Sequence, residues 1–244
     1  MIIIITLIST ILFATLIACL AKHTGPYLLQ SFYAGSLVTA IYVAGKLFDA
    51  SHLGLSIGLS ASILVYSATF ILTDVLSEIY GPKEARKAII GALCCYPIVA
   101  ISTQFAVHVP AHAHYGANEA FSSVMGFGLW IVFASVIGFT CSQFTDITIY
   151  HLLKKVSKRK MLWLRNNGST IVSQLIDTVV FYSIAFYGVF PIGQIIIYTV
   201  IAKVAIAAVD TPFVYFVRSY HEKYYHFTDR LFAGVMKRIG KARA

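Results

Sequence analysis

The chain is organised around the stretch Thr73-Asp-Val-Leu-Ser-Glu-Ile-Tyr-Gly-Pro-Lys-Glu-Ala-Arg-Lys87. This stretch closes a long apolar run, turns at Gly81-Pro82 and passes through a basic cluster before the next apolar run begins. Asp74 and Glu78 are four positions apart, so on a helix they share one face. Because carboxylates at membrane depth are costly, two of them on one face predict a functional use.

The composition of the 244-residue chain is that of a helical membrane protein. Hydrophobic residues make up 58% and charged residues 12%, with a mean hydropathy of +0.78, whereas soluble domains carry about 25% charged residues. The apolar segments run to about 20 residues, the length of a membrane-spanning helix and about twice that of a barrel strand. We therefore predict an all-α, polytopic integral membrane helical bundle.

Seven apolar segments are long enough to cross a bilayer. The first, residues 2–20, is interpreted as a retained span because no basic residues precede it and it exceeds the roughly 7–15 residues of a signal-peptide core. The other six are expected at about 29–47, 55–80, 85–107, 122–153, 169–188 and 194–217. The predicted organisation is an extra N-terminal span and loop (1–28), a six-span core (29–217) and a basic cytoplasmic tail (218–244).

The net charge of +9 predicts the orientation. Segments 21–28, 81–87 and 154–165 and the tail after 217 hold 1, 3, 6 and 7 Lys or Arg residues, which is 17 of the 19 in the chain. The positive-inside rule places them on the cytoplasmic side, with the N-terminus outside and the C-terminus inside. This distribution argues against nucleic acid as a partner and favours anionic membrane lipid near residues 154–160.

The predicted spans contain four further ionisable residues: Asp146, Asp177, Lys203 and Asp210. Intramembrane charges normally face the bundle interior and pair with one another. Among the carboxylates, Asp177 matches Lys203 best in depth. Such a pair fits a functional cavity, and it also fits a purely structural role in fixing helix register.

A short internal echo links two spans. Ser142-Gln143-x-x-Asp146 in the fifth span recurs as Ser173-Gln174-x-x-Asp177 in the sixth. Gln and Asp three apart share a helix face, so each span offers an amide and a carboxylate together. Since these spans are antiparallel, the echo indicates two sides of one polar cavity, although a match of five residues also arises by chance.

Neither a metal centre nor a catalytic site is predicted, and no cofactor is expected. His108, His112 and His114 lie in one loop, but their spacing is weak for a metal without acidic neighbours. The four cysteines lack metal-ligand spacing, and no nucleophile lies beside a base. Carboxylates with amides recognise edges rich in N–H donors, such as that of guanine, and carboxylates can also carry protons. The residues therefore indicate a transporter of a small polar solute.

Two ordered motifs resemble the queuosine-precursor transporter family, a vitamin-uptake-transporter-like group of bacterial inner-membrane proteins. They are Asp74-Val-Leu-Ser-Glu-Ile-Tyr-Gly81 with Ala85-Arg-Lys87, and Leu162-Trp-Leu-Arg-Asn-Asn-x-Ser-Thr170 with Ser173-Gln-Leu-Ile-Asp-Thr178. The resemblance covers about residues 30–217. It implies uptake of 7-cyano- or 7-aminomethyl-7-deazaguanine for queuosine modification of tRNA. It also implies a fold similar to the six-helix substrate-binding subunits of energy-coupling-factor transporters, from which the first span departs.

The resemblance carries the motif positions of the family over to Asp74, Glu78, Arg165, Asn166, Asn167, Gln174 and Asp177. With the other polar residues of the spans, the predicted substrate-binding set is Asp74, Glu78, Gln143, Asp146, Arg165, Asn166, Asn167, Gln174, Asp177, Lys203 and Asp210. Asp74 or Glu78 is expected to receive the N–H edge of the base. An aromatic sandwich is also expected, because stacking on a flat base contributes about 1–3 kcal/mol. Its candidates are Phe70, Tyr80, Phe144 and Phe181.

Three functional hypotheses follow. The chain is a secondary carrier with a proton as coupling ion on Asp177 or Glu78, or a binding subunit that needs a separate ATPase, or a small membrane enzyme. For the second hypothesis, Ala14-x-x-x-Ala18 offers a small-residue face for a partner. Formation of a homo-oligomer is left open.

Overall fold

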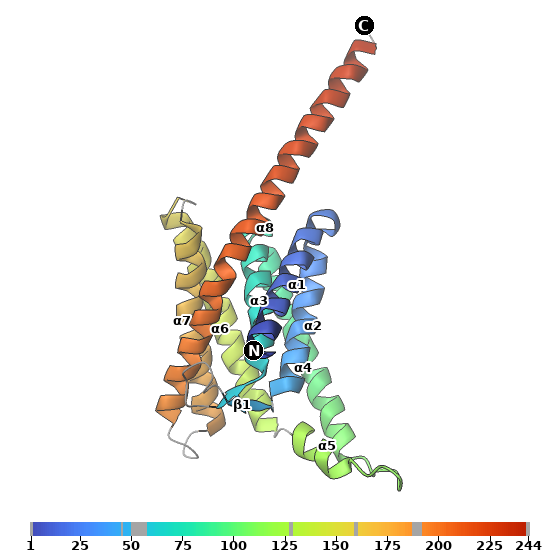
Figure 1. Cartoon of the computed structure of the whole chain (residues 1–244), viewed down its shortest axis with the longest axis vertical. Coiled ribbons are helices and arrows are strands. Elements are labelled where there is room, and N and C mark those ends of the chain that lie inside the picture. The colour runs from blue at the N-terminus through green and yellow to red at the C-terminus, as the bar shows by residue number, and fades with distance from the viewer. Residues whose placement is uncertain are drawn as a thin grey trace.

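The computed structural model describes residues 2–44, 46–49, 58–126, 129–158, 161–186 and 192–242. The long helices form one bundle (Figure 1), which confirms the all-α prediction. The helices are α1 (Ile2–Thr24), α2 (Pro26–Ala44), α3 (Ser62–Val75) with its π-helical continuation η2 (Leu76–Tyr80), α4 (Pro82–His108), α5 (Asn118–Met125), α6 (Leu129–Val156), α7 (Leu162–Phe186) and α8 (Ile192–Ala242). Two short strands, β1 (Leu47–Asp49) and β2 (Gly58–Ser60), pair antiparallel.

Within the described residues, six helical segments are long and apolar enough to cross a membrane. They are Ile3–Thr24, Ser62–Tyr80, Pro82–His108, Val132–Val156, Leu162–Ala185 and Ile195–Lys223. The chain is therefore a multi-pass membrane protein. The predicted second span corresponds to α2, which is not among these six, so the count of seven spans and the N-out orientation stay predictions.

The basic segments gather at one end of the bundle. In Figure 1 the α1–α2 turn, the η2–α4 turn and the C-terminal end of α6 lie at the same end, from which the last part of α8 extends. We call this the basic end, defined by Lys22, Gly81–Lys87, Lys154–Lys158 and Arg218. Strands β1 and β2 and helix α5 lie at the opposite end (Figure 1). The prediction that these basic segments share one side of the membrane is consistent with this arrangement.

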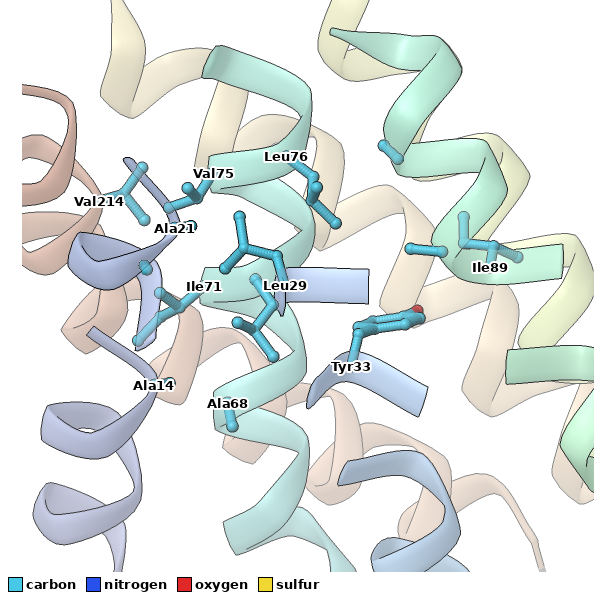
Figure 2. Packing of buried hydrophobic residues seen from close by; sticks show 14 of the residues in the cluster. Ala14, Ala21, Leu29, Tyr33, Ala68, Ile71, Val75, Leu76, Ile89 and Val214 are labelled. Atoms are coloured by element: carbon cyan, nitrogen blue, oxygen red, sulfur yellow. The ribbon is translucent and has the colours of Figure 1, made fainter. Parts of the chain in front are cut away.

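Helix α1 packs into the bundle along a stripe of small residues. Ala14, Ala18 and Ala21 have no exposed surface, and they meet α2, α3 and α8 in the main apolar cluster (Figure 2). Small side chains allow membrane helices to approach closely. Because Ala14 and Ala18 are already covered from within the chain, the prediction that they form a face for an ATPase partner is wrong.

The third and fifth predicted spans begin later than expected. Residues 58–60 pair with residues 47–49 as β2, and α3 begins only at Ser62. The predicted helix from 122 to 153 is two helices, because α5 ends at Met125 before Gly126 and α6 begins at Leu129. Glycine has a low helix propensity, which favours the break.

The sixth and seventh spans are longer than predicted. Helix α7 begins at Leu162, whose side chain is fully buried, instead of at residue 169. Ser169 and Asn167 therefore lie inside the helix and do not cap it. Helix α8 continues without a break past residue 217 to Ala242, so the basic tail begins as a helix.

Candidate functional site

Glu78 lies at the basic end inside a cluster of cations. Its Oε1 accepts from Nη2 of Arg165 at 2.6 Å and lies 3.3 Å from Nη1 of Arg218. Its Oε2 lies 2.8 Å from Nζ of Lys154 and accepts from the hydroxyl of Tyr150 at 3.0 Å. The Glu78 side chain is 6% exposed and that of Arg165 is 0% exposed. Both carboxylate oxygens are thus occupied by partners from α6, α7 and α8.

The local sequence explains how Glu78 reaches these partners. Helix α3 widens into η2, and the helix then stops at Gly81, whose φ of 89° is rarely adopted by other residues. Pro82 follows as the first residue of α4, where its missing N–H leaves no bond unmade. The turn therefore holds Glu78 two residues before the end of η2, against the C-terminal end of α6 and the N-terminal end of α7.

Asp74 lies one turn deeper, among other buried acids. It is 2% exposed, and its neighbours include Asn166 within hydrogen-bonding reach and the carboxyl groups of Asp146 and Asp210. Asp146 is 7% and Asp210 is 1% exposed. These three acids come from three different helices, α3, α6 and α8.

The two amides at the start of α7 converge on α8. Nδ2 of Asn166 and Nδ2 of Asn167 donate to Oγ1 of Thr211 at 3.2 and 2.9 Å. Asn167 also donates to the carbonyl of Trp163 within α7. Asn166 is buried beside Asp74, whereas Arg165 pairs with Glu78, so these two neighbouring residues contact two different carboxylates.

The sequence echo corresponds to a contact between its two copies. Oγ of Ser173, from the second copy, donates to Oδ1 of Asp146, from the first, at 3.1 Å. Helices α6 and α7 also approach closely at Gly138, where a Cβ atom would lie 3.2 Å from the carbonyl oxygen of Asp177. The echo therefore marks a pair of antiparallel helices that face each other with polar residues.

The predicted pair of Asp177 and Lys203 is confirmed. Nζ of Lys203 lies 2.5 Å from Oδ2 of Asp177 and 3.4 Å from Oγ1 of Thr178. The two side chains are 15% and 10% exposed. The Lys203 ammonium also lies 5.7 Å from the ring centroid of Tyr66, a cation–π distance. This pair joins α7 to α8 and faces α3.

Three tyrosines that were not predicted from the sequence lie around the Asp177–Lys203 pair. The hydroxyl of Tyr33 on α2 donates to Oε1 of Gln143 on α6 at 2.9 Å. Tyr96 on α4 lies within hydrogen-bonding reach of Tyr66, and the rings of Tyr33 and Tyr96 both pack on Phe139. Figure 2 shows the Tyr33 ring between Leu29 and Ile89, with its hydroxyl directed away from Leu29. A buried tyrosine needs a polar partner, but with 15 tyrosines in the chain no sequence signal separates these three.

The four predicted aromatic residues do not form one group. Phe70 packs on Tyr66, while the hydroxyl of Tyr80 donates to the carbonyl of Ala21 at the basic end. Phe144 packs against the main apolar cluster, and Phe181 lies edge-on to Tyr182.

Several buried acceptor oxygens have no hydrogen-bond partner within the described part of the chain. They are both carboxylate oxygens of Asp210, Oδ1 of Asn166 and Oε1 of Gln174. These residues are 1–3% exposed. Since buried polar atoms are nearly always bonded, acceptors left open in this way suit a ligand that brings donors.

The sequence model of a family described as "Putative vitamin uptake transporter" matches residues 60–217. A "Probable queuosine precursor transporter" of Bacillus subtilis is 34% identical over 165 residues, which are 65% of this chain and 72% of that protein. A protein of the same description from Haemophilus influenzae is 28% identical over 51% of this chain and 50% of its own length. The "Queuosine precursor transporter" of Escherichia coli is 25% identical over 48% of this chain and 51% of its own length.

No solved structure matches the chain.

Proposed function

The chain belongs to the vitamin uptake transporter family, and on that premise we propose that it takes up a queuosine precursor across the bacterial inner membrane. The proposed substrate is 7-cyano- or 7-aminomethyl-7-deazaguanine, carried without chemical conversion. Three relatives whose names describe queuosine precursor transporters support the substrate class.

The observation that carries the proposal is the set of unpartnered acceptors on α7 and α8. Asp210, Asn166 and Gln174 offer four buried oxygens that receive no hydrogen bond from any residue that the structure describes. A deazaguanine presents ring and exocyclic N–H donors along one edge, so it would supply what these acceptors lack. A site whose buried acceptors need donors from the ligand rejects analogues that lack those donors. This requirement gives selectivity for the guanine-like edge.

The geometry supports different roles for the two motif carboxylates. Glu78 already holds Arg165, Lys154 and the Tyr150 hydroxyl, so in this proposal it organises the basic end. Asp74 is buried next to Asn166, which supports a role on the substrate side. Asp146 is held by Ser173 and supports that side from α6.

Aromatic rings and one ion pair would complete the site. Stacking surfaces for a planar base would come from the rings of Tyr33, Tyr66 and Tyr96. Asp177 and Lys203 form its wall, with Gln143 held by Tyr33.

The proposed transport requires the bundle to open. Because the acceptor residues are nearly without exposed surface, a solute reaches them only after a conformational change. We propose a secondary carrier in which a proton on one of the buried carboxylates is the coupling ion.

Titration of the purified protein tests the proposal. The two deazaguanines, guanine and the queuosine nucleoside are compared by calorimetry, with saturable binding of at least one deazaguanine expected. Proteoliposomes loaded at different internal pH then report uptake, which should follow an inward proton gradient and collapse with a protonophore. Absence of binding to both deazaguanines by a folded protein would refute the assignment, and uptake indifferent to the proton gradient would refute the coupling alone.

A further inference from the structure

A hollow at the basic end has no part in the proposed uptake site. It is an open pocket of about 710 Å³, lined by Glu78–Pro82 of η2 and its turn and by His151, Lys154, Lys155 and Lys158. It lies where the start of α4 meets the end of α6. We propose that this pocket binds the phosphate group of an anionic phospholipid.

The pocket carries positive charge that internal pairing does not cancel. Its one carboxylate, Glu78, is already shared by Lys154, Arg165 and Arg218. In the described residues no carboxylate pairs with Lys155 or Lys158. The hollow therefore presents at least two uncompensated cations to an incoming anion.

His151 lines the pocket and carries a buried polar atom. Its Nε2 is buried and has no hydrogen-bond partner in the part of the chain that the structure describes. Lys154 and Arg86 lie close enough to interact with this ring electrostatically. A phosphate oxygen is an acceptor that the protonated or suitably tautomeric ring nitrogen can satisfy.

Solvation of the end of α6 is the plainer explanation for these lysines. Lys154 and Lys155 lie in the last turn of α6, where cations offset the negative end of the helix dipole. That role accounts for the charge but not for a hollow of this size with a buried, unbonded imidazole nitrogen in its wall.

The surroundings favour a lipid over a soluble anion. On the same helix, Leu152 and Val156 are 58% and 72% exposed, and Ile90 on α4 is 52% exposed. Apolar side chains exposed this strongly on membrane helices face acyl chains. Trp163, 56% exposed at the start of α7, marks the interfacial level, where phosphate groups lie. Basic pockets between membrane helices at this level suit anionic lipid head groups.

The test uses the full-length protein in neutral detergent with added phosphatidylglycerol, phosphatidylcholine or inorganic phosphate. Native mass spectrometry counts bound lipid, and thermal unfolding reports the stabilisation. The variant Lys155→Gln/Lys158→Gln removes the two uncompensated cations. Lys87→Gln/Lys223→Gln removes the same number of charges outside the pocket, one from α4 and one from α8, and is the control.

Phosphatidylglycerol is expected to bind the unaltered protein at least fivefold more tightly than phosphatidylcholine, since each cation near an anionic head group contributes about fivefold. The pocket variant should lose at least fivefold in this affinity while the control keeps it. Equal loss in both variants would show a general charge effect and overturn the site. Protection by inorganic phosphate equal to that by phosphatidylglycerol would overturn the lipid assignment. Neither readout depends on deazaguanine binding, so failure here leaves the uptake proposal untouched.

Discussion

Glu78 on η2 and Arg165 on α7 are joined at 2.6 Å, and the Arg165 side chain has no exposed surface. Nε and Nη1 of the same guanidinium have no partner within the described residues, so Glu78 is the carboxylate that this buried cation depends on. Glu78 thereby links η2 to α7, and through Lys154 and Arg218 it also links η2 to α6 and α8. Four helices meet at one carboxylate.

Replacement of Glu78 by Gln should destabilise the protein. The change leaves the buried Arg165 charge without its partner, and loss of one member of a buried pair costs about 3 kcal/mol or more. Thermal unfolding in detergent measures the loss. Glu84→Gln is the control, because the partner Lys87 is exposed and contributes little, and the new amide oxygen can still accept from Gln30, so unfolding should stay nearly unchanged. A Glu78→Gln protein as stable as the control would contradict the inferred dependence of Arg165 on Glu78.

A double-mutant cycle on Asp177 and Lys203 should separate stability from transport. Asp177→Asn and Lys203→Met alone each strand a largely buried charge, so each should cost about 3 kcal/mol. The double variant should regain most of that stability because no unpaired charge remains. Uptake, in contrast, should stay lost in the double variant if the pair lines the substrate path. Full uptake by a stable double variant would assign the pair to helix register alone.

Asp210→Asn is expected to weaken binding without weakening the fold. Within the described residues neither carboxylate oxygen of Asp210 has a hydrogen-bond partner, so the side chain contributes little to stability in the absence of substrate. The amide replaces one acceptor by a donor, which should lower deazaguanine affinity by about tenfold, the worth of one buried hydrogen bond. Calorimetry gives the affinity and thermal unfolding the stability, which should be unchanged or raised. Glu222→Gln, at an exposed side chain, is the control. Unchanged affinity in folded Asp210→Asn would remove this residue from the site.

Gly138→Ala should test the close approach of α6 and α7. A Cβ atom there would lie 3.2 Å from the carbonyl oxygen of Asp177 and 3.4 Å from Cβ of Phe181. The helices must separate slightly, which costs about 1–3 kcal/mol and offsets the roughly 1 kcal/mol that alanine gains over glycine in a helix. Gly35→Ala, where nothing lies within 4 Å, should show that gain undiminished. If both variants were stabilised equally in thermal unfolding, the contact at Gly138 would not constrain the helix pair.

The position of each polar residue within its apolar segment predicted part of the site. Asp177 and Lys203 lie near the middles of their apolar segments, and the structure joins them. The basic segments likewise lie at one end because apolar runs of similar length alternate in direction. Depth says nothing about the lateral neighbours of a helix, however. That α6, α7 and α8 all turn cations to Glu78 depends on how the helices pack side by side, which no spacing within one segment reveals.

The start of α7 and the tyrosine group show a second limit. Leu162–Thr170 contains amides, glycine and serine, which local propensity favours at a helix boundary. Burial of Leu162, Arg165 and Asn166 against other helices overrides that preference. Tyr33, Tyr66 and Tyr96 come from three helices, and they are set apart from the other tyrosines only by the residues that they meet in the bundle.

The wide turn of η2 has a mechanical consequence. A π-helical turn holds one residue more than an α-helical turn of the same helix would. If Leu76–Tyr80 tightened to α-type bonds, the segment beyond it would swing by about 100° around the helix axis, the rotation that one residue makes in an α-helix. Such a swing would carry the Glu78 carboxylate away from Arg165 while Asp74, which lies before the turn, kept its orientation. The ion pairs of the basic end would then break through a change of backbone hydrogen bonds within five residues, while Asp74 and the acids near it stay in place.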